Sequence, residues 1–194
     1  MLRRYNSLYL SIILRYKTYI EQSENLYLPD TPKLITPDSD EVFAFVISIK
    51  NEVEPYDFKS NFYEASIKVL EKLEAKISIL QLPIQFWQTP SETLLNGIGD
   101  MLDYYSLLCS ILISLGGVAT KVLVLSIEDN SKVVVYSEDI NNNVLLFEHS
   151  KEVKKFKNKE LMFKYLIDKN NSDITAYEFN DKLYRDLTLP LFSS

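Results

Sequence analysis

Two residues of this sequence could together act as a nucleophile and its general base. Cys109 is the single cysteine and His149 the single histidine among 194 residues. A thiol attacks a carbonyl group as the thiolate, and a nearby imidazole usually removes its proton. Cys109, however, lies in an apolar stretch, where buried cysteines are inert, and His149 is expected at the surface, at a strand end. We therefore do not expect the two residues to form a catalytic pair.

The residue counts also limit metal chemistry. A single cysteine excludes an internal disulfide and a zinc site built from several cysteines. A single histidine excludes a metal site with two histidines from one chain. The carboxylates of Glu92, Asp100 and Asp103 are candidate ligands, but acids at such places more often cap helices and accept hydrogen bonds in turns. We expect no metal and no cofactor.

Residues 86–117 contain the elements that must position these groups. Pro90 precedes a short helical turn, and a Gly-Ile-Gly sequence then supplies a tight bend. Asp100 stands where a helix N-cap belongs, since its carboxylate can accept hydrogen bonds from the next turn. Residues 101–115 are almost all apolar or small, which predicts a helix buried on all sides. Gly116 and the following glycine are expected to end this helix.

This stretch resembles the core of the transglutaminase-like superfamily, which has a papain-like cysteine protease fold. The matching residues are Pro90-Ser91-Glu92-Thr93-Leu94, Gly97, Gly99-Asp100, Asp103-Tyr104, Leu107-Leu108 and Leu115-Gly116. The resemblance implies an α+β fold in which the buried central helix packs on an antiparallel sheet. The family has its nucleophilic cysteine directly after the Gly-Asp pair, where this chain has Met101. A thioether has no ionisable proton and forms no thiolate.

The resemblance also implies places for the other two members of the catalytic triad. The family histidine opens a pattern like H-V-Y-x-E, and here Val134 stands in its place, or Val133 if the register slips by one. The family aspartate follows an apolar strand, and here Glu148 does so. The positions Met101, Val134 and Glu148 would thus form a degenerate triad. A remaining ligand cleft would include Trp87, Gln88, Asp100, Asp103 and Tyr136.

The remaining elements follow from hydrophobic periodicity and turn residues. We predict two parts, residues 1–39 with an amphipathic helix and a proline-containing linker, and residues 40–194 with the transglutaminase-like domain. In the second part we expect helices at 41–54, 58–77 and 155–169, strands at 119–127, 132–138 and 143–148, an edge strand at 174–179 and a C-terminal loop.

Apolar residues recur at helical spacing between residues 2 and 22, with arginines and lysine on the other side. We expect this extra N-terminal helix to dock on its own domain or on a second copy of the chain, which would make a homo-oligomer; the alternative is a membrane surface. The apolar run of residues 8–14 stops at Arg15 with no signal-cleavage site after it, and no run is long enough to span a membrane. We therefore expect a cytoplasmic protein.

The formal net charge is −6 and the isoelectric point about 4.9, which argues against nucleic-acid binding. The lysines at 151, 154, 155, 157 and 159 are expected to be a solvated surface. The predicted function is a catalytically inactive transglutaminase-like protein, or pseudoenzyme, that binds or scaffolds a protein or peptide partner. Two alternatives remain: a cysteine hydrolase or peptidase with displaced catalytic residues, which would have to use His149, and an oligomeric accessory protein, for example of a virus.

Overall fold

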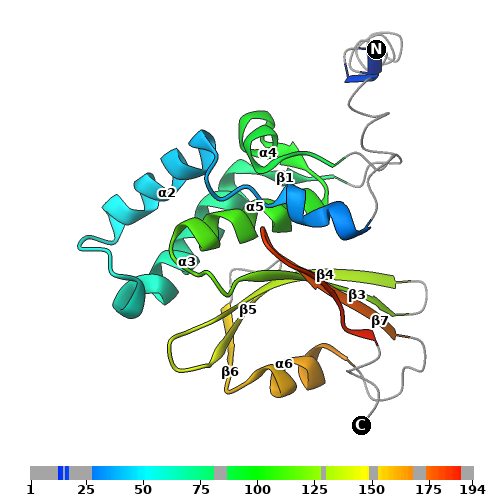
Figure 1. Ribbon diagram of the computed structural model, residues 1–194. Helices are drawn as coiled ribbons and strands as arrows, with labels where there is room; N and C mark the ends of the chain where they lie inside the picture. Colours follow the sequence, from blue (N-terminus) through cyan, green and yellow to red (C-terminus); the bar gives the residue numbers. More distant parts are fainter. Residues whose placement is uncertain are drawn as a thin grey trace.

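A computed structural model describes residues 13–14, 16–17, 28–80, 87–127, 130–148, 153–167 and 174–188. Helices α2 to α5 cover one face of an antiparallel sheet, and helix α6 covers the other face (Figure 1). The predicted α+β fold, with a central helix packed on an antiparallel sheet, is confirmed. The predicted domain boundary at residue 40 stays a prediction, although Ile35, which precedes it, already belongs to the main core.

The helical elements are η1 (Leu28–Leu34), α2 (Asp40–Glu52), α3 (Phe58–Lys76), α4 (Pro90–Asn96), α5 (Met101–Ser114) and α6 (Lys159–Leu166). The strands of the large sheet are β3 (Lys121–Ile127), β4 (Asn130–Glu138), β5 (Val144–Phe147), β6 (Val153–Phe156), β7 (Ile174–Phe179) and β8 (Tyr184–Asp186), in the spatial order β6-β5-β4-β3-β7-β8. Two short strands, β1 (Ser78–Ile79) and β2 (Ile98–Gly99), form a separate parallel pair before α5.

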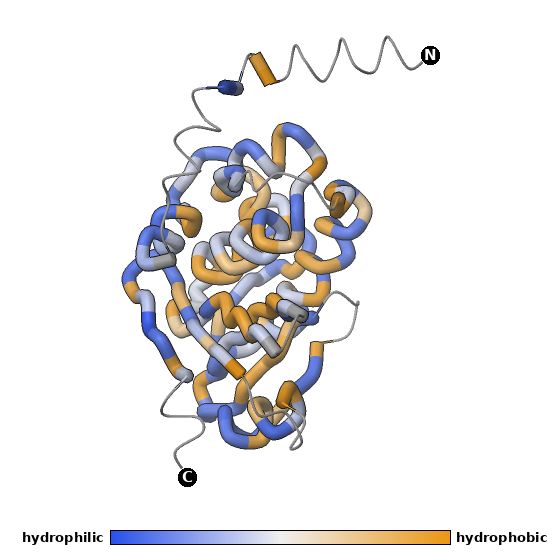
Figure 2. Tube along the Cα trace, turned by 90° about the vertical axis from the view of Figure 1, so that its right-hand side faces the viewer, coloured by the Kyte–Doolittle hydropathy of each residue, from blue (hydrophilic) through white to orange (hydrophobic). Residues whose placement is uncertain are grey.

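Helix α5 is the centre of the main core. Its apolar sequence buries it between α2 and α3 on one side and the sheet on the other, as predicted. Asp100 caps its first turn by accepting a 2.8 Å hydrogen bond from the N–H of Asp103. At its end Gly116 has a φ of 107°, a conformation that L side chains rarely adopt. Figure 2 shows apolar residues running through the middle of the molecule, where α5 meets the strands.

Both faces of the large sheet are apolar. The side chains of Val122, Val124, Val133, Val135, Leu145 and Phe147 pack toward the helices α2, α3 and α5. Those of Leu123, Leu125, Val134, Tyr136, Val144 and Leu146 form a second cluster with Met162 and Leu166 of α6. The strands are therefore nearly continuous apolar runs, because each must bury alternate residues on opposite faces.

The structure corrects the sequence predictions after residue 150. The helix predicted at 155–169 is in fact strand β6 followed by a shorter helix α6, whose first turn is capped by the side chain of Asn158. Strand β7 is not at the edge, since β3 and β8 both pair with it. The missed strand β8 is only 3 residues long, and such a short strand depends on its partner rather than on a local pattern.

Several predicted features lie partly or wholly outside the described residues. These are the extended segment before Trp87, His149, Lys151, the last residues of the C-terminal loop and most of the N-terminal amphipathic helix. Within that helix, residues 13–14 and 16–17 are helical. No helix among the described residues is both long and apolar enough to cross a membrane.

Candidate functional site

Met101 is the first residue of α5 and borders a pocket of about 300 Å³. The pocket is bordered by Met101, Tyr105, Ser131, Lys132, Val133, Val134 and Glu148, so all three positions of the predicted degenerate triad meet there. Helix α5 supplies one wall and the adjoining ends of β4 and β5 supply the other. The side chains of the three residues nevertheless do not all face one another.

Strand β4 presents Val133, rather than Val134, to α5. Val133 packs against the core that contains α5, whereas Val134 is fully buried in the cluster on the α6 face. Neighbouring residues of a strand point to opposite faces, so only one of the two can face Met101. Val133 is therefore the residue of β4 that lies opposite the start of α5. This is the alternative register that the sequence analysis left open.

Glu148 is held between two lysines on the α6 side of the sheet. One carboxylate oxygen lies 2.7 Å from the Nζ of Lys132, and the other lies 2.6 Å from the Nζ of Lys154. The Tyr165 hydroxyl of α6 lies 3.1 Å from Glu148 and also accepts a hydrogen bond from Lys154. Burial alone would raise the pKa of the Glu148 carboxyl, but the hydrogen bonds from the two lysines lower it below its usual value. Glu148 is thus the centre of an ion-pair cluster.

Sequence reasoning missed Lys132 and Tyr165, and it placed Lys154 on a solvated surface rather than in an ion pair with Glu148. Lys132 and Glu148 stand at the ends of adjacent antiparallel strands, and Lys154 stands on the next strand. Opposite charges across neighbouring strands commonly pair. This signal could have revealed the cluster only if β6 had been recognised as a strand.

Gln88, Asp100 and Asp103 join the start of α5 to the segment before α4. The Asp103 carboxylate accepts hydrogen bonds from the backbone N–H of Gln88 at 2.8 Å and from that of Asp100 at 2.9 Å. The Gln88 side chain donates to the Ile98 carbonyl at 2.9 Å and accepts from Asn96 at 2.7 Å. Burial, together with the nearby charge of Asp100, raises the pKa of Asp103 to about 6.

These polar residues hold the backbone rather than lining the pocket. Asp103 and Gln88 are buried, and neither they nor Trp87, which is half-buried, borders the pocket next to Met101. Among the described residues, no three acidic, cysteine or histidine side chains form a group that could hold a metal ion. Asp100 and Asp103 have the capping role that their spacing predicts.

Tyr136 does not belong to the predicted cleft. Its side chain is on the α6 face of β4, where its hydroxyl donates a hydrogen bond to the buried carboxylate of Glu178. The same carboxylate lies 2.6 Å from the Nζ of Lys121. Burial and the charge of Glu178 raise the pKa of Tyr136 above its usual range. The even-numbered position of Tyr136 on β4, like that of Val134, points it away from α5.

Cys109 is fully buried in the middle of α5. Burial strongly raises the pKa of its thiol, which opposes formation of the thiolate. Eight residues along the helix separate it from Met101, a rise of about 12 Å. The single thiol is therefore remote from the pocket, and His149 lies outside the described residues.

Comparison with known proteins shows which solved structures have a similar fold. No family model matches the chain, and no curated protein matches it in sequence. The structure of EGTA-treated LapG from Legionella pneumophila is similar, with a TM-score of 0.50 and 14% sequence identity, covering 83% of this chain and 90% of that one. The chain has a transglutaminase-like, papain-like fold. The calcium-bound form of LapG gives a TM-score of 0.44 and 15% identity over 72% of this chain and 86% of the other.

At this level of identity the similarity to LapG shows the fold alone. The equivalence of Met101 with a nucleophile position therefore rests on the Gly-Asp motif at the start of α5 and on its place in the transglutaminase-like fold. In this fold Met101 begins the central helix, and Val133 is the β4 residue beside it that faces the same core. Both side chains are apolar, and neither carries an ionisable proton.

Proposed function

We propose that this chain is a transglutaminase-like domain without thiol chemistry that binds a protein or peptide partner. The observation that carries the proposal is Met101 at the first position of α5, with Val133 on the facing side of β4. Neither side chain can donate or accept a proton. Loss of one triad member in a serine protease already lowers the rate by orders of magnitude.

The ion pairs of Glu148, the acidic position of the predicted triad, agree with this proposal. In a triad the carboxylate orients the imidazole by accepting a hydrogen bond from its N–H group. Here both oxygens of Glu148 bind ammonium groups, those of Lys132 and Lys154. An imidazole would have to displace one of these ion pairs before it could be oriented by Glu148.

Binding is favoured because the pocket persists without the catalytic groups. It measures about 300 Å³, the lower end of the range for ligand sites, and combines apolar side chains of Met101 and Val133 with the polar rim of Ser131 and Lys132. A pocket of this size suits a single side chain of an extended peptide. Retention of an apolar recess with polar rim groups supports recognition of a polypeptide rather than its cleavage.

The catalytic half of the proposal is tested with a peptidyl epoxide that alkylates active cysteine nucleophiles. We expect the epoxide not to label Cys109 in the folded chain, whereas iodoacetamide, a general thiol reagent, should label it fully after unfolding in urea, because only unfolding exposes the thiol. Rapid stoichiometric labelling of Cys109 in the native chain, abolished by His149→Ala, would instead establish a displaced hydrolase.

The binding half is tested by affinity capture with two tryptophan variants. Met101→Trp fills the pocket, whereas Val118→Trp adds the same side chain at an exposed turn outside it. A partner that is retained by the wild type and by Val118→Trp but lost by Met101→Trp supports recognition through the pocket. If all three proteins capture the same set, the pocket is not the recognition site.

A further inference from the structure

Two surface helices each expose a pair of large apolar side chains one turn apart. On α2 the pair is Phe43 and Ile47, and on α6 it is Leu161 and Tyr165. Residues at i and i+4 lie on the same side of a helix, so each pair forms a small apolar strip. The strips are matched in exposure, with Ile47 43% and Leu161 42% exposed.

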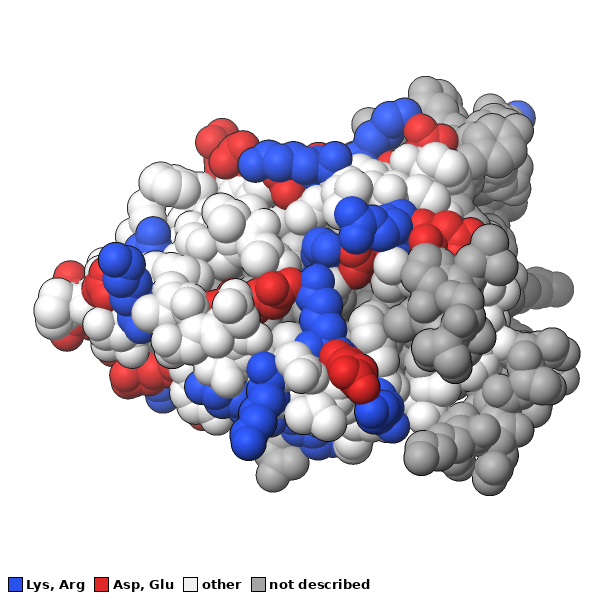
Figure 3. Space-filling model, turned by 60° about the horizontal axis from the view of Figure 1, so that its bottom comes forward, with Lys and Arg blue, Asp and Glu red and all other residues white. Residues whose placement is uncertain are grey.

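The charges around the two strips differ. On α6 the Tyr165 ring lies 4.5 Å from the Nζ of Lys154 and 5.9 Å from that of Lys132, and Lys164 is the residue before it. Figure 3, which brings the α6 side of the molecule forward, shows lysines and arginines spread across this face among a few acids. Because Lys132 and Lys154 pair with Glu148 and Lys164 pairs with Glu160, the α6 strip has no excess of negative charge to attract a basic partner.

Helix α2 has acids at both ends of its strip. Asp40 and Glu41 form its first turn, and Glu54 lies just beyond its last turn, where Glu52 pairs with Lys72 of α3 at 2.5 Å. Its one basic residue, Lys50, lies 5.2 Å from the Tyr56 ring. A basic partner would therefore be attracted to the α2 strip.

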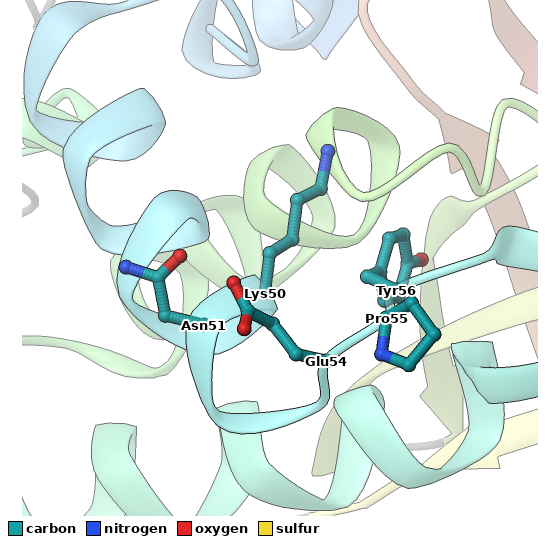
Figure 4. Close-up of a pocket in the computed structure, with 5 residues that line it drawn as sticks. All are labelled: Lys50, Asn51, Glu54, Pro55 and Tyr56. Carbon is teal, nitrogen blue, oxygen red and sulfur yellow. The ribbon is translucent and has the colours of Figure 1, made fainter.

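The α2 strip leads into a second hollow of the surface. One further turn from Ile47 is Asn51, which borders an open pocket of about 460 Å³ together with Lys50, Glu54, Pro55 and Tyr56 (Figure 4). Tyr56 forms a firm wall, because its hydroxyl donates a 2.6 Å hydrogen bond to the carbonyl of Leu115. Strip and pocket together make a continuous face along α2, which we call the α2 face.

The N-terminal segment of the same sequence has the complementary chemistry. Residues 1–22 contain four basic residues and one acid, which gives them a net charge of +3. Since the whole chain has a net charge of −6, residues 23–194 have a net charge of −9. The apolar residues of the segment recur at helical spacing, and a lone helix of this length is marginal in water unless its apolar side is packed. Ile13 and Leu14 are nevertheless 42% and 66% exposed within the single chain.

We propose that the N-terminal segment of one chain docks on the α2 face of a second copy, and that two chains exchange segments in this way. A basic, amphipathic segment meets an apolar strip with acids at its ends, and the exposure of Ile13 and Leu14 leaves them free to bind in trans. Reciprocal exchange closes the assembly as a symmetric dimer, so that both α2 faces are covered.

Sedimentation equilibrium of the full chain tests this arrangement. We expect a dimer that dissociates more readily as salt rises, because screening weakens the charge complementarity. Ile47→Asp should raise the dimer dissociation constant at least tenfold. Leu161→Asp is the matched control, with the same substitution at equal exposure on α6, and should leave the constant within twofold. Circular dichroism checks that both variants fold.

A mixing experiment separates docking in trans from docking in cis. Ile13→Asp damages the segment and Ile47→Asp damages the α2 face, so each variant alone should be monomeric. An equimolar mixture still contains one intact segment and one intact α2 face, and it should form a heterodimer held by a single contact. Absence of this heterodimer, or equal dissociation by Leu161→Asp, would overturn the proposal. So would a monomeric wild type, including one that binds anionic vesicles through the segment.

Discussion

The carboxylates of Asp100 and Asp103 cap each other's backbone at the start of α5. The N–H of Asp103 donates to Asp100 at 2.8 Å, and the N–H of Asp100 donates to Asp103 at 2.9 Å. The N–H of Gln88 is the second backbone donor to Asp103. This pair places Met101 at the edge of the pocket, but it also keeps two acids close together in a buried setting, and stability should therefore depend on pH.

Asp103 should make the protein less stable as the pH rises from about 4 to 6. Burial and the charge of Asp100 raise the folded-state pKa of Asp103 to about 6, above its unfolded value. The proton is therefore bound more tightly in the folded state, and this stabilisation, complete below the unfolded pKa, is lost as the pH rises through about 6. Between the unfolded and folded pKa values, the free energy of unfolding of the wild type should fall with pH more steeply than that of Asp103→Asn. The difference in slope should be at most about 1.4 kcal/mol for each pH unit. Urea unfolding from pH 4 to 7 measures the difference, with the exposed Asp38→Asn as the control that keeps the wild-type slope.

Gly99→Ala should destabilise the junction between β2 and α5. A Cβ at this position would lie 2.9 Å from the Cβ of Asp103, closer than real Cβ contacts come, and 3.3 Å from Cγ2 of Thr93, which is a tight contact. We expect a loss of about 1–3 kcal/mol in the free energy of unfolding, as for other overpacked sites. Val118→Ala, at an exposed position, should change it by less than about 0.5 kcal/mol. Equal stability of the two variants in urea unfolding would show that the junction can relax.

Lys121→Met should be far more destabilising than Lys164→Met. Lys121 is the 2.6 Å partner of the buried Glu178 carboxylate, so its removal leaves a buried charge poorly compensated. The expected cost is about 3–5 kcal/mol. Lys164 pairs with Glu160 on the exposed surface of α6, where solvent screens the pair and its loss should change the stability little. Similar melting temperatures for the two variants would contradict the structural importance of the Glu178 network.

Met101→Cys should introduce a reactive thiol where the buried Cys109 offers none. Met101 is partly exposed at a helix N-terminus, a place that lowers a thiol pKa, so iodoacetamide should label one cysteine in the native variant and none in the wild type.

Adding a histidine to this variant tests which valine faces α5. Met101→Cys with Val133→His should be alkylated faster at pH 7 than Met101→Cys alone, because the imidazole can take the thiol proton. Val134→His points to the α6 face and should give no acceleration. The reverse order of rates would restore Val134 as the residue opposite Met101.

The sequence alone determined the central helix and its neighbours, because the signals there are local. The apolar run of α5, the Asp100 cap and the terminal glycines act within a few residues of one another, and the hairpin spacing after Gly117 predicts an antiparallel sheet. The proposal that Met101 stands at a nucleophile position likewise rests on the Gly-Asp motif alone.

Only the tertiary structure decided which side chains face the pocket. Because both faces of the sheet are apolar, the strand sequences lack the alternation that would separate Val133 from Val134, and a shift of one residue reverses every side chain. The partners of Glu148 come from β4, β6 and α6, which are brought together by strand pairing rather than by sequence spacing. Short strands such as β6 and β8 depend on the neighbours to which they bond, so their place could not be read from their own residues.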